Sequence, residues 1–157
     1  MTTSTPAHGP FGLPTLEGIL GGYSEFGTTL TRIAAGLFLV PHGAQKLFGW
    51  FGGYGLEATG QFFTSQLGFS NGYLAALGAG SVEFFAGLAL AVGLFTRSAA
   101  IAITVMLLVA SQFHFASGFF WTDGGWEYPI LWAVVAFSFA LKGGGRYSLD
   151  QKFGIRY

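Results

Sequence analysis

Four apolar segments dominate this chain, near residues 27–48, 73–95, 98–120 and 126–142. Each is about 20 residues long, which is enough for a helix to cross a hydrocarbon core about 30 Å thick. Charged side chains make up only 9% of the chain, against about 25% in a soluble domain. The chain therefore lacks the polar surface of a soluble globule, and the sequence predicts an all-α, integral membrane four-helix transmembrane bundle.

The rest of the chain divides around these segments. Residues 1–15 mix Thr, Ser, Pro and Gly without a period and predict a disordered tail. Residues 16–145 form the predicted membrane domain, and residues 146–157 form a C-terminal tail. Between the first two spans, residues 50–72 are compatible with either a short interfacial helix or a glycine-rich loop.

The positions of Lys and Arg predict the orientation. Cations concentrate in the connection between the second and third spans and in the C-terminal tail, at Arg97, Lys142, Arg146, Lys152 and Arg156. The connection between the third and fourth spans carries only Asp123 and Glu127, and Lys46 is the one exception to the pattern. Because cytoplasmic loops are enriched in Lys and Arg, we expect the N and C termini to be cytoplasmic.

Glu83 lies near the middle of the second span, where an ionised group costs about 2.5–3.5 kcal/mol on insertion scales. Its short side chain cannot reach the interface, so it must face the bundle interior. Ala76, Gly80 and Gly87 share its helix face and would let a neighbouring helix approach closely. Glu83 is therefore either part of a functional site or a structural ion-pair partner.

In the first span, Arg32, Gly36, Gly43 and Lys46 fall on one narrow stripe, which predicts a packed seam. Pro41, which precedes His42, weakens the backbone hydrogen bonds of the first span. The imidazole of His42 is then either a buried side chain bonded to a freed carbonyl or part of a polar site one turn before Lys46.

Depth along the spans groups several ionisable residues in the outer half of the bundle. The candidate ligand-binding residues are His42, Lys46, Glu83, His114 and Glu127. The alternative is a set of structural ion pairs, with Arg32, Lys46, Glu83 and Glu127 as candidates. No catalytic residue is assigned. No His/Glu pair has the i, i+3 or i, i+4 spacing of a helical metal motif, so we expect no metal.

The composition argues against nucleic-acid binding and excludes chemistry that depends on cysteine. The chain has zero net charge and no basic block, which argues against nucleic-acid binding. It has no Cys, so it forms no disulfide and holds no iron–sulfur cluster. A redox role would therefore depend on a bound cofactor.

Three motifs occur in order along the chain. The first consists of Arg32, Gly36 and the run His42-Gly43-Ala44-Gln45-Lys46-Leu47-Phe48-Gly49. The second runs from Glu83 through Gly87 to Thr96-Arg97. The third is Arg146-Tyr147-Ser148-Leu149-Asp150. Together they resemble the DoxX family of small four-helix bacterial membrane proteins. The resemblance implies the bacterial inner membrane and a relationship to the membrane subunit of thiosulfate:quinone oxidoreductase.

On this basis we expect a redox-associated membrane subunit that binds a quinone or a small anionic ligand, in contact with membrane lipids and partner proteins of a redox complex. The chain itself shows no cofactor site, so a flavin or metal would come from a partner. The alternatives are a small-molecule or ion permease and a non-catalytic scaffold. The glycine-rich helix faces allow contacts within one chain or in a homo-oligomer.

Overall fold

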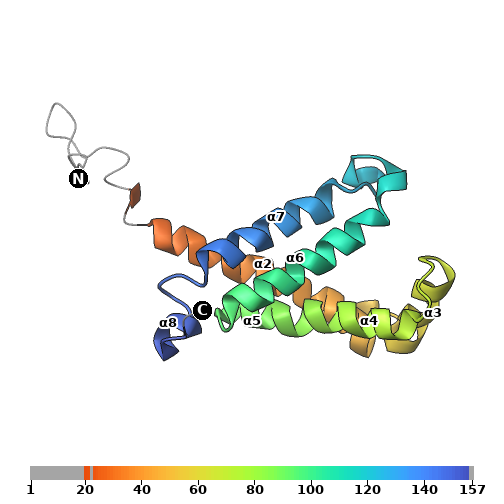
Figure 1. The fold of residues 1–157 in the computed structure, drawn as a ribbon, viewed down its shortest axis with the longest axis horizontal. Helices are drawn as coiled ribbons and strands as arrows, with labels where there is room; N and C mark the ends of the chain where they lie inside the picture. The colour runs from red at the N-terminus through yellow and green to blue at the C-terminus, as the bar shows by residue number, and fades with distance from the viewer. Residues whose placement is uncertain (1–19, 22, 156–157) are drawn as a thin grey trace, which may run out of the picture.

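The computed structural model describes residues 20–21 and 23–155, and within them every regular element is helical and none is a strand (Figure 1). The predicted disordered tail, 1–15, lies outside the described residues. The elements are α2 (Ser24–Phe48), η1 (Trp50–Gly52), α3 (Gly55–Ser65), α4 (Gly72–Ser81), η2 (Val82–Ala86), α5 (Gly87–Val92), α6 (Thr96–Gln112), η3 (Phe115–Ser117), η4 (Trp121–Asp123), α7 (Glu127–Lys142) and α8 (Leu149–Phe153). The all-α prediction is confirmed.

Four long helical stretches run side by side and set the shape of the molecule (Figure 1). Helices α4 and α5 are joined by the π-helical turn η2 into one rod, Gly72–Val92. The rod packs against α2, and α6 packs against α7. Helix α8 and the turn between α5 and α6 lie at one end, the α8 end, whereas α3 and the α6–α7 loop lie at the other, the α3 end.

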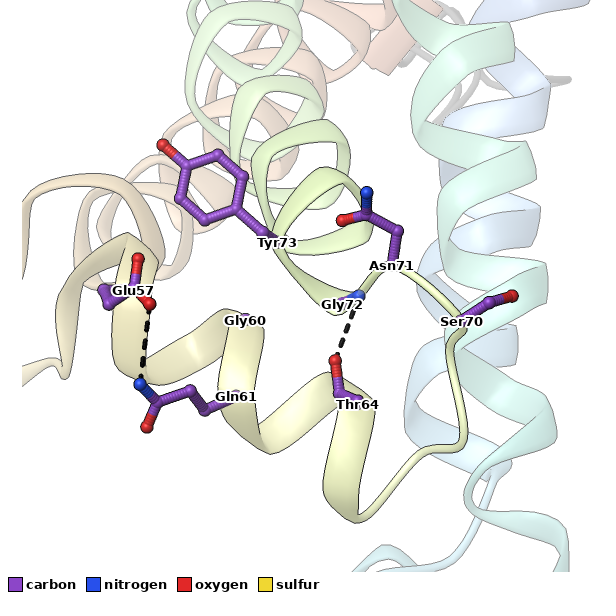
Figure 2. A pocket seen from close by; sticks show the side chains of 8 residues that line it. All are labelled: Glu57, Gly60, Gln61, Thr64, Ser70, Asn71, Gly72 and Tyr73. Carbon is purple, nitrogen blue, oxygen red and sulfur yellow. Dashed lines mark hydrogen bonds between the residues drawn. The ribbon is translucent and has the colours of Figure 1, made fainter.

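The segment between α2 and α4 contains a helix, α3, rather than only a loop. Helix α3 folds back on the start of α4, where the backbone N–H of Gly72 donates to Thr64 Oγ1 at 3.1 Å (Figure 2). A hollow of about 370 Å³ lies between the two helices, and the side chains of Glu57 and Asn71 contribute to its lining. This hairpin covers the α3 end of the rod.

Glycines allow α2 to approach the rod closely. A Cβ on Gly36 would meet the backbone of Gly87 and Ala91, and a Cβ on Gly43 would meet the backbone of Gly80 and Phe84. Gly36 and Gly43 are seven residues apart on α2, and Gly80 and Gly87 are seven residues apart on the rod. Each pair therefore falls on one face of its helix. The packed seam predicted from the sequence is confirmed, and it continues through buried Arg32.

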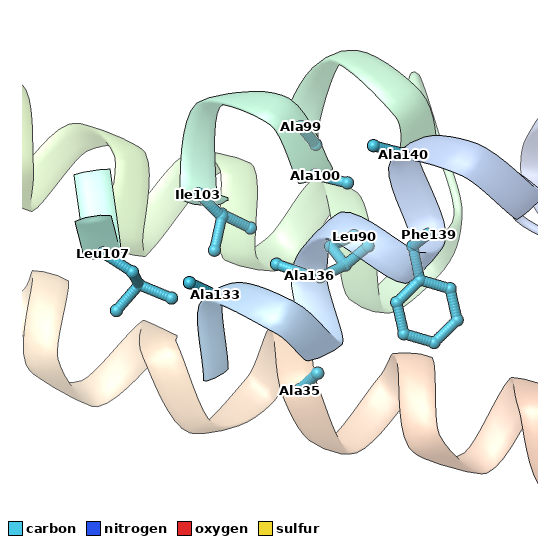
Figure 3. Packing of buried hydrophobic residues seen from close by; sticks show 10 residues of the cluster. All are labelled: Ala35, Leu90, Ala99, Ala100, Ile103, Leu107, Ala133, Ala136, Phe139 and Ala140. Atoms are coloured by element: carbon cyan, nitrogen blue, oxygen red, sulfur yellow. The ribbon is translucent and has the colours of Figure 1, made fainter. Parts of the chain in front are cut away.

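The core is built mostly from small residues. Its members converge from α2, α5, α6 and α7 in Figure 3, and they are Ala35, Leu90, Ala99, Ala100, Ile103, Leu107, Ala133, Ala136, Phe139 and Ala140. Large apolar side chains lie outside, with Phe38 60% and Leu131 60% exposed. Small residues inside and large apolar residues outside are typical of helices packed within lipid.

Among the described helices, only the rod Gly72–Val92 is both long and apolar enough to cross a membrane, with a mean hydropathy of 1.7. Helix α6 is apolar but has 17 residues, and α7 has 16. The third predicted span, 98–120, is helical only as far as Gln112, and residues 113–120 form turns and a short 3-10 segment. At 1.5 Å per residue, α6 alone is about 25 Å long.

Candidate functional site

Lys46 and Glu83 form an ion pair between α2 and the rod. Lys46 Nζ lies 2.8 Å from Glu83 Oε2 and donates a hydrogen bond to Glu83 Oε1 at 2.9 Å. The Lys46 side chain is 25% exposed and the Glu83 side chain 10%. The carboxylate is therefore compensated inside the bundle, while the ammonium keeps access to the molecular surface.

The glycine seam and η2 together position this pair. Gly43 and Gly80 contact each other close to Lys46, which brings α2 within reach of the Glu83 side chain. Glu83 itself lies in η2, a single π-helical turn inside an otherwise α-helical rod. Such π-bulges occur frequently at functional sites, because they re-aim a side chain without breaking the helix.

His42 lies one turn before Lys46 on α2 and is exposed. It is close enough to interact electrostatically with Glu83. One turn further back, the exposed Phe38 ring packs edge-on against Trp132 of α7, with centroids 5.9 Å apart. The imidazole, the ammonium and the carboxylate thus form a small polar cluster, the His42–Lys46–Glu83 cluster, beside an apolar aromatic surface.

The structure places His114 in the α6–α7 loop and Glu127 at the first residue of α7. His114 Nδ1 lies 2.7 Å from the carbonyl oxygen of Gly124, and Glu127 Oε1 accepts a hydrogen bond from the backbone N–H of Trp121 at 2.8 Å. Both contacts hold the loop in shape. These hydrogen bonds join both residues to the α6–α7 loop, not to Lys46 or Glu83.

Arg32 is almost fully buried, with 1% of its surface exposed. Its Nη1 donates to the carbonyl oxygens of Leu90 and Ala91 at 2.7 and 2.6 Å, and its Nη2 donates to the carbonyl of Tyr147 at 2.8 Å. The guanidinium therefore caps the C-terminal, negative end of α5. Its hydrogen-bond acceptors are backbone carbonyls, and the carboxylate of Asp150 also acts on it electrostatically.

A second capping residue, Asp150, was not singled out from the sequence. Its two carboxylate oxygens accept the backbone N–H groups of Phe95 and Thr96 at 2.7 and 2.8 Å, at the N-terminus of α6. Ser148 is the N-cap of α8, where its side chain accepts the backbone N–H of Gln151. The motif Arg146-Tyr147-Ser148-Leu149-Asp150 was the available signal, since it brings a cap and a carboxylate together.

No group of three or more His, Cys, Asp or Glu side chains is arranged to hold a metal ion in the described part of the chain. The His42–Lys46–Glu83 cluster offers hydrogen-bond donors at Lys46 and His42, beside one paired carboxylate.

A model of the DoxX family matches residues 27–116, which is more than half of the chain. The chain belongs to the DoxX family. The matched region of this DoxX protein contains Arg32, Lys46 and Glu83 and ends before Glu127 and Asp150. Membership in the DoxX family supports a membrane protein. No curated protein and no solved structure matches the chain.

Proposed function

We propose that this DoxX protein spans the inner membrane with four helical segments and has both termini in the cytoplasm. The long apolar rod, the family and the exposed apolar side chains support the membrane placement. The cations Arg97, Lys142, Arg146 and Lys152 all belong to the α8 end, which supports its cytoplasmic location. Helices α6 and α7 are short for a full crossing, and aromatic side chains of their loop would extend into the interface.

We further propose that the His42–Lys46–Glu83 cluster binds the polar head of a quinone for a redox-associated assembly. The observation that carries this proposal is the exposed imidazole of His42 beside a surface-accessible ion pair on a helix that otherwise exposes Leu37 and Phe38. A polar group facing lipid is costly unless something meets its hydrogen bonds. A ligand dissolved in the membrane could reach it laterally.

The donors in this cluster fit such a ligand. A quinone has two carbonyl oxygens that accept hydrogen bonds, and when bound it supplies two-electron redox chemistry coupled to protons. His42 would donate one hydrogen bond and hold or deliver a proton. Lys46 would orient the same head while Glu83 keeps the ammonium in place, and the exposed Phe38 ring would contact the apolar part.

The test compares two histidines. We expect wild-type protein, extracted gently from its own membrane, to retain quinone detectable by native mass spectrometry and lipid analysis. His42→Gln should lower the retained quinone about tenfold, the cost of one strong hydrogen bond. His114→Gln is the matched control, because the hydrogen bond of that imidazole is made to Gly124 within the α6–α7 loop. An absence of quinone in the wild type, or equal retention in both variants, would contradict the quinone proposal.

A scaffold is the second candidate, and the geometry of the ion pair favours it. Lys46 and Glu83 already compensate each other, so they can lock α2 to the rod without any ligand. In a scaffold, Glu83→Gln lowers the thermal stability of the protein in detergent while the His42→Gln variant keeps wild-type stability. The scaffold gains support if neither wild type nor variants retain a small ligand.

A further inference from the structure

A second polar cavity, of about 390 Å³, lies at the α8 end, remote from the His42–Lys46–Glu83 cluster. It is formed where the start of α6, the end of α7 and the segment leading into α8 meet. Its volume lies at the lower end of the range of ligand pockets, about 300–1,000 Å³. The lining residues are Arg97, Lys142, the three glycines 143–145, Ser148, Asp150, Gln151 and Ile155.

Arg97 is held rigidly in this cavity by one of its nitrogens. Nη1 donates to the carbonyl oxygens of Ala140 and Leu141, both at 2.6 Å, and so caps the C-terminus of α7. The other edge of the guanidinium, Nε and Nη2, faces the backbone at Gly143. A glycine there leaves no side chain between this edge and the cavity. The planar fork is thus fixed before any ligand arrives.

Lys142 supplies a second cation at the mouth of the cavity. It is exposed, and its Nζ donates a hydrogen bond to Thr28 Oγ1 at 2.7 Å. An ammonium group has three donors, so within the described residues two remain for a ligand. An arginine fork and a lysine on one polar cavity are the side chains that proteins use for phosphate.

Asp150 is the single acid among the lining residues, and its charge is already compensated. Both of its oxygens accept backbone N–H groups at the start of α6, the positive end of that helix dipole. The carboxylate is therefore not free to attract a cation into the cavity. Among the lining residues, the uncompensated charges are the cations Arg97 and Lys142. Glu25 lies beside Gly145, where its carboxylate accepts the backbone N–H of Arg146 at 3.3 Å, and exposed Arg146 and Lys152 belong to the same end.

We propose that this cavity binds a phosphate group, supplied by the headgroup of an anionic membrane lipid. The lipid source rests on the membrane placement proposed above, because that placement puts the α8 end at the cytoplasmic leaflet, where anionic lipids attract basic pockets. Free inorganic phosphate offers the same chemistry without a membrane. Arg97 would hold two phosphate oxygens with its fork, and Lys142 would neutralise the remaining charge.

The test uses full-length protein in detergent with equal amounts of phosphatidylglycerol and diacylglycerol, which lacks phosphate. Native mass spectrometry should show preferential retention of phosphatidylglycerol. Lys142→Gln should lower that retention about tenfold. Lys152→Gln is the matched control, because Lys152 is exposed at the same end but does not line the cavity, and it should retain lipid as the wild type does.

Arg97→Lys keeps the charge but loses the fork, so it should also weaken retention, with thermal unfolding measured in parallel to confirm that each variant is folded. Displacement of the lipid by excess inorganic phosphate would confirm a phosphate site. Binding of inorganic phosphate without lipid retention would overturn the lipid source. Equal retention of the two lipids, or equal losses in Lys142→Gln and Lys152→Gln, would overturn the site. None of these outcomes depends on whether quinone binds at His42.

Discussion

Single residues at the α8 end satisfy the backbone of helices far away in the sequence. Arg32 caps the last carbonyls of α5, Arg97 caps those of α7, and Asp150 caps the first N–H groups of α6. Unpaired polar groups at a helix end are costly when water is excluded. These three residues therefore close the helix ends at the α8 end with charge of the appropriate sign at each terminus.

Asp150→Asn tests this role. The amide keeps one oxygen acceptor and loses the second, together with the negative charge at the N-terminus of α6. We expect the free energy of unfolding to fall by about 1–2 kcal/mol, measured by thermal or detergent-induced unfolding. Asp123→Asn, an exposed residue of the α6–α7 loop, is the control and should have little effect. Equal stability of the two variants would show that Asp150 does not cap α6.

The positions of Lys46 and Glu83 along their predicted spans put them at similar depth, and both lie on helix faces lined with glycine. Together these two features are sufficient to place Lys46 opposite Glu83. Glu127 begins α7 as expected, but depth cannot show that His114 lies beyond the end of α6, since it gives no information about where a helix ends. The capping role of Arg32 was also beyond sequence reasoning. Every residue has a backbone carbonyl, so the sequence does not indicate which residues accept the hydrogen bonds of an arginine that binds carbonyls.

At the level of elements, the contact between α2 and the rod depends on glycine. Gly36→Ala would place a methyl group against the backbone of Gly87 and Ala91, which cannot move as a side chain can. We expect the free energy of unfolding to fall by about 1–3 kcal/mol. The midpoint of unfolding in a denaturing detergent measures this change.

Gly78→Ala provides the matched control on the rod. A Cβ at Gly78 meets nothing within 4 Å, so the substitution only improves helix propensity. It should leave stability unchanged or raise it by up to about 1 kcal/mol. If Gly36→Ala behaved in the same way, the seam would not be the contact that holds α2 to the rod.

The positions of the helices followed from the apolar segments, but their ends did not. The third segment remains apolar through Phe113, Phe115 and Phe119, although the helix stops at Gln112. Apolar residues in a loop at a membrane surface are indistinguishable by composition from residues inside a span. The π-helical turn η2 was equally invisible, because residues Val82 to Ala86 carry no helix-breaking residue.

For the whole molecule, the distribution of cations predicts which end faces the cytoplasm. The chain has no Cys, so single cysteines can report accessibility without a background. Thr122→Cys, in the α6–α7 loop, should react with a membrane-impermeant maleimide in intact cells. Gln151→Cys, on α8, should react only after the membrane is permeabilised. The reverse pattern would invert the orientation, and labelling of both sites in intact cells would contradict a membrane-spanning arrangement.

The carboxylate of Asp150 also bears on how the molecule assembles during synthesis. The N–H group of Thr96 precedes its partner by 54 residues along the chain. At roughly 5–20 residues per second, translation delivers that partner several seconds after the start of α6 has emerged. Throughout that interval the first amides of α6 lack this carboxylate and depend on other partners, such as water. The turn between α5 and α6 therefore acquires its final geometry only when α8 arrives.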